Sequence, residues 1–254
     1  MKLPYLIISL LLLAIPSLAQ DNNTKKAYGY GVTFMEEGDH MPDALYYLPA
    51  PPETGTEAFI NDSLVYERGK RLRLTARGDT AVMDVNTSIP YYFKRFSPAV
   101  GKELTEEKYP VLAKTLRGVL QDVRGGIQHA KNTFARHRPY QHFKEGTPIP
   151  EDEYPTDYTS YPSGHTVRAW AAAMLLTAVF PEAGTEIMRI GHELGDSRTI
   201  VGFHYQSDVE AARHCAGAGF ARLCGKKSFL EALMKCQEEA KKYLVVWCFG
   251  GLVV

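Results

Sequence analysis

The segment that decides the fold is Thr166–Phe180, with the sequence TVRAWAAAMLLTAVF. Wound as an α-helix, this segment is apolar almost all the way round. A helix with apolar residues on every side has to be buried on every side. The segment therefore predicts a central helix enclosed by other helices, and Pro181 is expected to end it.

Helical spacing of apolar residues recurs earlier in the chain. It predicts an amphipathic helix that begins at Phe59 and runs to about Leu74. A second helix is predicted to begin at Pro110, a residue suited to a first helical turn. The pair Gly125-Gly126 is expected to kink this second helix before it continues toward Arg136.

Three further features complete the helical pattern. A short helix around Ile187–Leu194 is expected to stop at Gly195. The capping boxes Ser207-x-x-Glu210 and Ser228-x-x-Glu231 predict that two more helices start at these serines. Strict alternation of apolar and polar residues, which is typical of strands, is scarce. We therefore predict an all-α fold, a single-domain multi-helix bundle without internal repeats.

Composition changes along the chain predict its organisation. Residues 1–19 resemble a secretory signal peptide, with a basic Lys2, an apolar stretch and the cleavage site Ser17-Leu18-Ala19. An uncleaved anchor is less favoured, because a span needs about 20 apolar residues. Residues 20–55 are polar and then Pro-rich, which predicts an extended arm before an all-helical domain at 56–254. The apolar run Tyr243–Val254 is too short to span and is expected to be a docked tail. The signal peptide predicts that the protein is periplasmic or secreted.

The composition also excludes some partners. Lysine plus arginine and aspartate plus glutamate number 29 each, so the sequence predicts no basic surface for nucleic acid and no acidic tail. Neither His-x-x-x-His nor Cys-x-x-Cys occurs, and we expect no metal and no cofactor. The oligomeric state is left open, a homo-oligomer included.

An exported chain enters an oxidising compartment, where its four cysteines are able to pair. Cys215 and Cys224 are predicted to lie on one helix, roughly 13 Å apart at about 1.5 Å per residue, too far to bridge each other. Pairing with Cys236 or Cys248 and buried free thiols are equally good interpretations.

The first of three polar motifs is Lys131-x6-Arg138-Pro139. Lys131 and Arg138 are two helical turns apart, so they are expected to share one face of a helix that Pro139 ends. Two cations on one face suit an anion with several oxygens, and arginine can hold two oxygens at once. Because Arg136 and His137 lie in the same stretch, a solvated basic face is the simpler interpretation of this motif alone.

The second motif, Pro162-Ser163-Gly164-His165, stands directly before the central helix. A Ser-Gly turn at a helix N-terminus offers free N–H groups and the positive end of the helix dipole, which suit an anion. Gly164 allows a close approach of the backbone to a ligand. His165 is expected to project from the first turn beside that ligand. Taken alone, the motif is equally well explained as a serine cap with a surface histidine.

The third motif is Ser197-Arg198-x5-His204-x3-Asp208. If Ser207 caps a helix, Asp208 starts it and His204 lies in the turn before it. Asp208 can then accept a hydrogen bond from one imidazole nitrogen and leave the other as a nucleophile. A structural His–Asp hydrogen bond is the competing interpretation, and Arg198 adds a third cation.

Together the motifs predict phosphoryl transfer through histidine. Five groups are expected to hold the phosphoryl group: the side chains of Lys131, Arg138 and Arg198 and the amides of Ser163 and Gly164. His204, oriented by Asp208, attacks phosphorus to give a phosphohistidine. Protonated His165 donates to the leaving alcohol and later activates water. Because His165 must start charged and His204 neutral, mildly acidic pH is expected to favour the reaction.

These residues resemble the motif of the type 2 phosphatidic acid phosphatase and vanadium haloperoxidase superfamily, most closely its bacterial class A non-specific acid phosphatases. The likeness runs from about Tyr47 to Phe229. Its supporting stretches are Tyr47–Pro52, Asn61-Asp62, Tyr66–Gly69, Ser160–Thr166, Glu193–Arg198, Gly202–Val209 and Ala211–Arg213. The resemblance implies an all-helical fold, a secreted or periplasmic location, metal-independent hydrolysis of small phosphomonoesters of many kinds, and vanadate inhibition.

The resemblance assigns His204 as nucleophile, His165 as acid and Asp208 as the partner of His204. The chain departs from the family at two positions: Thr159 stands where glycine is usual, and Tyr205 where tryptophan is usual. Both flank the expected phosphate site, so they put the substrate range in doubt more than the reaction.

Other functions remain open on the sequence. An apyrase-like nucleotide pyrophosphohydrolase would use the same residues, and a vanadate-dependent haloperoxidase is less favoured because those chains are generally longer. A phosphate-binding protein would need neither histidine. A lipid phosphatase of the membrane would need spans that the sequence lacks after residue 19, and Ser163 lacks the G-x-S-x-G context of a serine hydrolase.

Overall fold

The computed structural model describes residues 31–242, and every regular element in this range is a helix. The predicted all-α fold is therefore confirmed. The predicted signal peptide (1–19), residues 20–30 of the predicted arm, Cys248 and the predicted tail Tyr243–Val254 lie outside the described residues.

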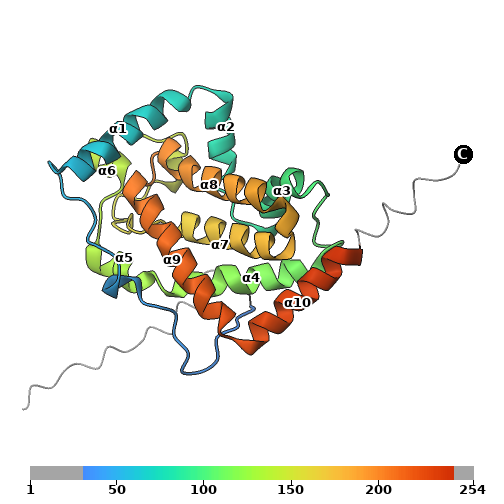
Figure 1. Ribbon diagram of the computed structural model, residues 1–254. Helices are drawn as coiled ribbons and strands as arrows, with labels where there is room; N and C mark the ends of the chain where they lie inside the picture. Colours follow the sequence, from blue (N-terminus) through green and yellow to red (C-terminus); the bar gives the residue numbers. More distant parts are fainter. Residues whose placement is uncertain (1–30, 243–254) are drawn as a thin grey trace, which may run out of the picture.

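Helix α7 (Gly164–Val179) lies at the centre of the bundle (Figure 1). It packs most extensively against α8 (Gly184–Ile200), and then against α9 (Gln206–Cys224), α4 (Pro110–Gly125) and α10 (Lys227–Lys242). These bounds confirm that the all-round apolar segment is the buried central helix.

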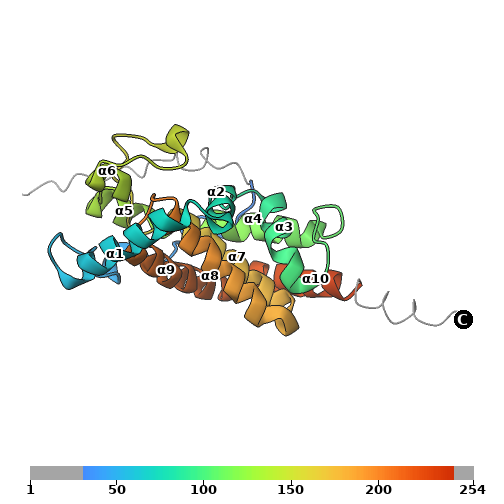
Figure 2. The ribbon, with the colours of Figure 1, turned by 90° about the horizontal axis from the view of Figure 1, so that it is seen from above.

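The remaining helices lie around this centre. Above α7 in Figure 1 are α1 (Glu57–Leu72), α2 (Ala76–Met83) and α3 (Ile89–Val100). The short α5 (Gln128–Phe134) and α6 (Pro139–Phe143) lie at the opposite end of the molecule from α10 (Figure 2). Three 3-10 turns complete the described chain: η2 (Ala44–Tyr46), η3 (Pro150–Asp152) and η4 (Pro181–Ala183).

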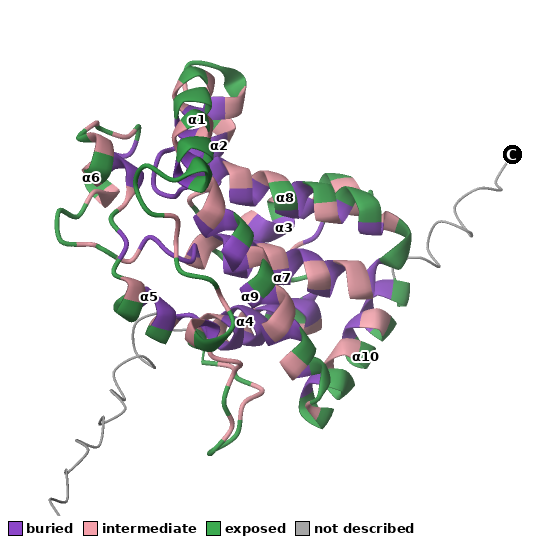
Figure 3. Ribbon diagram, turned by 60° about the vertical axis from the view of Figure 1, so that its left-hand side comes forward, coloured by how far each residue is buried: buried purple, intermediate pink, exposed green. Residues whose placement is uncertain are grey.

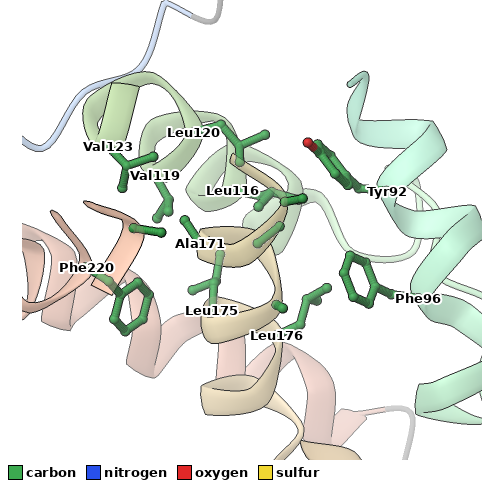
Figure 4. Close-up of a cluster of buried hydrophobic side chains, with 14 of the residues drawn as sticks. Tyr92, Phe96, Leu116, Val119, Leu120, Val123, Ala171, Leu175, Leu176 and Phe220 are labelled. Atoms are coloured by element: carbon green, nitrogen blue, oxygen red, sulfur yellow. The ribbon is translucent and has the colours of Figure 1, made fainter. Parts of the chain in front are cut away.

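The core follows from the apolar pattern of these helices. Exposed residues gather on the outward sides of α1 and α10, while the sides turned inward are buried (Figure 3). Leu116 and Val119 of α4 meet Ala171 and Leu175 of α7, and all four are fully buried (Figure 4). Burying a leucine or valine side chain is worth about 1.5–3 kcal/mol, so this cluster supplies a large part of the stability.

Residues 31–56 lack α-helix and are tied to the bundle by polar contacts. Asp122 of α4 accepts hydrogen bonds from the hydroxyl of Thr33 and the amide of Phe34. Asp39 forms ion pairs with Arg222 and Lys226, at 2.6 Å each. The ring of Phe34 also packs edge-on against Phe229 of α10. The segment therefore lies along α4 and α9 and contributes to the core.

Several predicted helix boundaries are wrong. Gly125-Gly126 does not kink a continuous helix: α4 ends at Gly125, and α5 is a separate helix that begins at Gln128. Helix α10 starts at Lys227, so Ser228 lies inside it and does not cap it. Gly195 does not stop α8, which continues to Ile200.

Close packing explains why α8 runs through Gly195. A Cβ atom built on Gly195 would lie 3.1 Å from methyl groups of both Thr166 and Val209. The absence of a side chain thus lets α8 approach α7 and α9. A glycine costs a helix about 1 kcal/mol relative to alanine, and the packing of three helices offsets that cost. The continued helix carries Ser197 and Arg198 to the end of the bundle.

The three cysteines that lie within residues 31–242 are free thiols. Cys215 and Cys224 do lie on one helix, as predicted. Cys215 and Cys236 are buried, and burial raises the pKa of each thiol to about 11. Between the two interpretations, the structure favours buried free thiols for this pair.

We predict opposite effects for alanine at two glycines of the bundle. A Cβ atom on Gly191 of α8 would lie 2.6 Å from Cβ of Ala173, so Gly191→Ala forces α7 and α8 apart. Overpacking of this kind costs about 1–3 kcal/mol. Gly217 of α9 has open space where its Cβ would be, so Gly217→Ala should stabilise by up to about 1 kcal/mol through helix propensity. Urea unfolding of both variants checks this, and equal effects would contradict the packing described.

Candidate active site

The residues of the three motifs gather at one end of the bundle. The N-terminus of α7, the C-terminus of α8 and the N-terminus of α9 meet there, close to α5 and α6 (Figure 1). A direct hydrogen bond joins two of these ends, since the amide of Ser163 donates to the carbonyl of Asp208 at 3.1 Å. Helix ends therefore place all three motifs on one site.

Lys131 and Arg138 reach the site from two different elements. The predicted shared helical face is wrong: α5 ends at Phe134, because Ala135 adopts the left-handed conformation with φ of 44°. Arg138 is extended and caps α6, and Pro139 begins that helix instead of ending one. The two cations converge all the same, since both donate to Thr159: Lys131 Nζ to its carbonyl and Arg138 Nη2 to its hydroxyl.

His204 and Asp208 form the predicted pair. The imidazole Nδ1 lies 3.3 Å from Asp208 Oδ2, and both side chains are buried. Arg138 Nη1 lies 3.2 Å from His204 Nε2 and can only donate, so Nε2 carries the lone pair and Nδ1 the proton. This is the tautomer that a nucleophilic Nε2 requires.

The start of α9 differs from the prediction, and this difference explains how the carboxylate of Asp208 is held in place. Tyr205, not Ser207, is the N-terminal cap, and Asp208 is the third residue of the helix. Its Oδ2 accepts from the amide of Tyr205 at 2.9 Å and from the hydroxyl of Ser160 at 2.6 Å. Burial raises the pKa of Asp208, but Arg136, His204 and the hydroxyl of Ser160 outweigh it, and the net shift is downward. Asp208 is thus held as a carboxylate.

Arg136 joins this carboxylate to a second one. Its Nη1 donates to Asp208 and its Nη2 to Asp62 at 2.8 Å, and all three side chains are at most 8% exposed. The guanidinium also lies 4.0 Å from the ring centre of Tyr205. Asp62 in turn accepts from the amide and hydroxyl of Ser207. A buried network of α1, Arg136 and α9 therefore fixes the position of Asp208.

The second motif forms the start of α7. Ser163 caps the helix by accepting a hydrogen bond from the amide of Thr166. Its own amide is occupied by Asp208, so it is not the free donor that the sequence predicts. The amides of Gly164 and His165 lie in the first turn, where a helix provides no acceptor. The side chain of Lys131 lies 3.7 Å from the position of a Cβ on Gly164, which places this cation against the helix N-terminus.

Arg198 is held at the site by its neighbour in sequence. The hydroxyl of Ser197 donates to the buried carboxylate of Asp84 at 2.6 Å and accepts from Arg77 at 2.9 Å. Arg198 is itself 2% exposed, and its Nε and Nη1 have no hydrogen-bond partner within residues 31–242. A buried guanidinium with unused donors is expected to bind an anion, because unsatisfied buried donors are costly.

Burial and the crowding of cations lower the pKa values of several side chains in the site. Burial and the charge of Arg138 lower the pKa of Lys131 to about 7 and that of Arg198 to about 9. Burial, with Arg138 nearby, lowers the pKa of His204 to about 3. Burial and Arg198 hold the pKa of His165 well below its ordinary value. The prediction that His165 starts charged therefore requires an anion beside it that offsets the charge of the cations.

Four residues of this site were not among the predicted site residues. They are Asp62, Arg136, Asp157 and Ser160. The sequence alone favours a solvated basic face for Arg136, and only its two-residue spacing from Arg138 indicates otherwise. In an extended segment such residues point to the same side. Asp157 carries no sequence signal, since its partner Arg138 is distant along the chain.

Comparisons with known proteins identify the family of this chain. A family model described as the PAP2 superfamily matches residues 109–229. A non-specific acid phosphatase of Providencia stuartii is 38% identical over 202 residues, which cover 79% of this chain and 82% of that protein. The chain belongs to the PAP2 superfamily. The resemblance drawn from the motifs is thereby confirmed.

Two further relatives extend the match. A non-specific acid phosphatase of Salmonella typhi is 36% identical over 208 residues, covering 79% of this chain and 82% of that protein. An acid phosphatase of Zymomonas mobilis subsp. mobilis is 29% identical over 201 residues, covering 79% and 76%. Within residues 31–242, no helix has the length and apolar character that crossing a membrane requires.

Proposed function

We propose that this PAP2 protein is an acid phosphatase that hydrolyses small phosphomonoesters through a phosphohistidine on His204. The observation that carries the proposal is the His204 imidazole, which is buried between Asp208 and Arg138 with its Nε2 lone pair facing a cation. The names of the relatives support the reaction class. Their description as non-specific supports a broad range of substrates.

In the first step, His204 Nε2 attacks phosphorus and the bond from phosphorus to the ester oxygen breaks. The developing charge lies on the equatorial oxygens, where Lys131, Arg138, Arg198 and the first amides of α7 neutralise it. Asp208 keeps the proton on Nδ1 and stabilises the imidazolium that forms. His165 gives its proton to the leaving alkoxide. A neutral alcohol departs and the phosphoryl group stays on His204.

In the second step, His165 removes a proton from water while the water oxygen attacks phosphorus. The bond from phosphorus to Nε2 breaks, and inorganic phosphate leaves with His204 neutral again. Burial and the neighbouring cation Arg198 hold the pKa of His165 well below its ordinary value, so His165 gains its proton only when the substrate binds. A phosphate monoanion gives its own proton to His165, whereas a bound dianion raises this pKa so that His165 takes a proton from the solvent. Acidic pH favours both routes.

Lys131 gives this site a testable pH dependence. With a pKa of about 7, it is charged below neutral pH and loses its charge as the pH rises above 7. A bound anion raises that pKa, so anion affinity should fall by up to tenfold for each pH unit above 7. Titration with sulfate measures this effect, because sulfate keeps its charge over the range. Lys131→Arg should remove the change near pH 7, and a pH-independent affinity in the unmodified protein would contradict it.

The reaction class is tested by one set of assays in the presence of a chelator. We expect hydrolysis of an aryl phosphate at acidic pH, with competitive inhibition by vanadate. ATP and a lysophospholipid measured alongside define the substrate range. Release of pyrophosphate or successive phosphates from ATP, with no action on the aryl phosphate, would favour the apyrase-like alternative. Bromination with vanadate and peroxide, without hydrolysis, would favour a haloperoxidase.

We also propose that the chain is exported and cut after Ala19, on the pattern of residues 1–19, leaving an arm to residue 55 and a catalytic domain from residue 56. Mass spectrometry of the exported protein is expected to find Gln20 at the N-terminus. A mature chain that retains Met1 would contradict this.

A further inference from the structure

Arg138 is bound on one edge by the loop that precedes α7. Asp157 Oδ2 accepts a hydrogen bond from Nε at 2.8 Å and forms an ion pair with Nη2 at 2.7 Å. Nη2 also lies 3.4 Å from the hydroxyl of Thr159. The Nε–Nη2 edge, which arginine ordinarily uses for a two-point grip on a carboxylate or phosphate, is therefore already occupied.

The other edge of the guanidinium faces His204. Nη1 donates to the carbonyl of Phe203 at 3.0 Å and to His204 Nε2 at 3.2 Å. The nucleophile has to release the second of these bonds before it attacks, so that proton becomes free for a phosphoryl oxygen. Arg138 thus offers the substrate a single N–H next to the attacking nitrogen. The two-oxygen grip predicted for this arginine from the sequence does not fit.

The loop is built to hold Asp157 in this place. Asp157 Oδ1 accepts from the amide of Thr159 at 2.9 Å and from its hydroxyl. The carbonyl of the same Thr159 accepts from Lys131 Nζ. Two of the three cations are therefore tied to one three-residue segment, Asp157–Thr159. Burial raises the pKa of Asp157, but Arg138 and Thr159 outweigh it and the net shift is downward, so the contact persists in acid.

We infer that Asp157 is a positioning residue of this site: with Thr159 it holds Arg138 so that only Nη1 meets the phosphoryl group, beside His204 Nε2. The inference rests on the proposed function for its kinetic consequences, but its consequence for anion binding does not. Without Asp157, the guanidinium is free to turn away from His204. Phosphate binding then weakens, because an arginine that must be ordered on binding contributes less to affinity.

The test compares Asp157→Ala and Asp157→Asn with Glu151→Gln, a control at an exposed carboxylate of the same loop. Binding of inorganic phosphate is measured by calorimetry and aryl phosphate hydrolysis by steady-state kinetics. For Asp157→Ala we expect Kd and KM to rise about tenfold, with kcat changed less than threefold. Asp157→Asn keeps an oxygen that can accept from Arg138 Nε, so it should recover at least half of this effect on a logarithmic scale.

Three results would overturn the inference. One is unchanged phosphate affinity in Asp157→Ala. A second is tighter binding in both variants, which would show that Asp157 acts only by neutralising Arg138. The third is an equal loss in Glu151→Gln. If the unmodified protein binds phosphate but hydrolyses nothing, the proposed function fails, while the calorimetric comparison still decides the role of Asp157.

Discussion

Replacing His204 by alanine should lower kcat for an aryl phosphate by about 10⁴-fold or more, since the variant has no nitrogen to accept the phosphoryl group. In the structure Nε2 of His204 faces Arg138 and Nδ1 faces Asp208. Among the hydrogen bonds of residues 31–242, no other histidine has this pair of contacts. His165 lies on α7 and has no carboxylate partner among the hydrogen bonds described for residues 31–242. It is therefore not expected to replace His204 as nucleophile.

Two measurements separate this loss of chemistry from loss of structure. The cations remain in His204→Ala, so sulfate should bind with an affinity within about threefold of the unmodified protein. His214→Ala, at an exposed histidine of α9, should keep full activity. Wild-type hydrolysis by His204→Ala would disprove the role of His204. Loss of both activity and sulfate binding would point to a collapsed site.

Replacing Asp208 by asparagine should lower both activity and stability. The substituted side chain would present an amide group to donors that now share the Asp208 carboxylate, among them Ser160, Arg136 and the amide of Tyr205. His204 would lose the acceptor that fixes its tautomer, and we expect kcat to fall about 10³- to 10⁴-fold. Breaking a buried ion pair in this way should lower the free energy of unfolding by about 3 kcal/mol. This is the lower end of the usual range, because Arg136 keeps its ion pair with Asp62.

The stability loss in Asp208→Asn should depend on pH in a defined direction. The folded pKa of Asp208 lies below its ordinary value of about 4. Its stabilising contribution is therefore complete above pH 4 and is lost as the pH falls toward the folded pKa. In urea unfolding, the free energy of unfolding of Asp208→Asn should lie below that of the unmodified protein by a constant amount from pH 8 to 5. This difference should become smaller below pH 4.

Glu210→Gln, on the exposed side of the same helix, is the matched control and should change stability by less than about 0.5 kcal/mol. If the loss of unfolding free energy in Asp208→Asn became larger in acid, Asp208 would have to be protonated in the folded protein.

The central helix could be predicted because its pattern depends on burial alone. Thr166–Phe180 is apolar almost all round, and the structure places a helix at Gly164–Val179 with most of that surface buried. The boundaries that failed depend on contacts between helices. Gly195 interrupts a helix in isolation, yet here its missing side chain admits Thr166 and Val209. The end of α5 depends on one left-handed alanine, Ala135, for which the sequence has no marker.

The motif residues could be placed together for a related reason. Each motif lies at a helix end, and the ends of neighbouring helices meet at one end of a bundle. The partners that hold those residues could not be found in this way. Arg136 and Asp157 are charged residues in polar stretches, where a solvated position is the ordinary expectation. Only the folded chain places Arg136 between Asp62 and Asp208, and Asp157 against Arg138.

The central claim, a phosphoryl group carried on His204, is tested most directly by trapping that intermediate. His165→Ala suits the experiment, because an aryl leaving group needs little acid catalysis while hydrolysis of the phosphohistidine still needs a base. After mixing with labelled aryl phosphate and quenching in alkali, where phosphohistidine is stable, we expect label on the peptide that contains His204. Label on another residue, or burst-free kinetics with no labelled peptide in this variant, would contradict the mechanism.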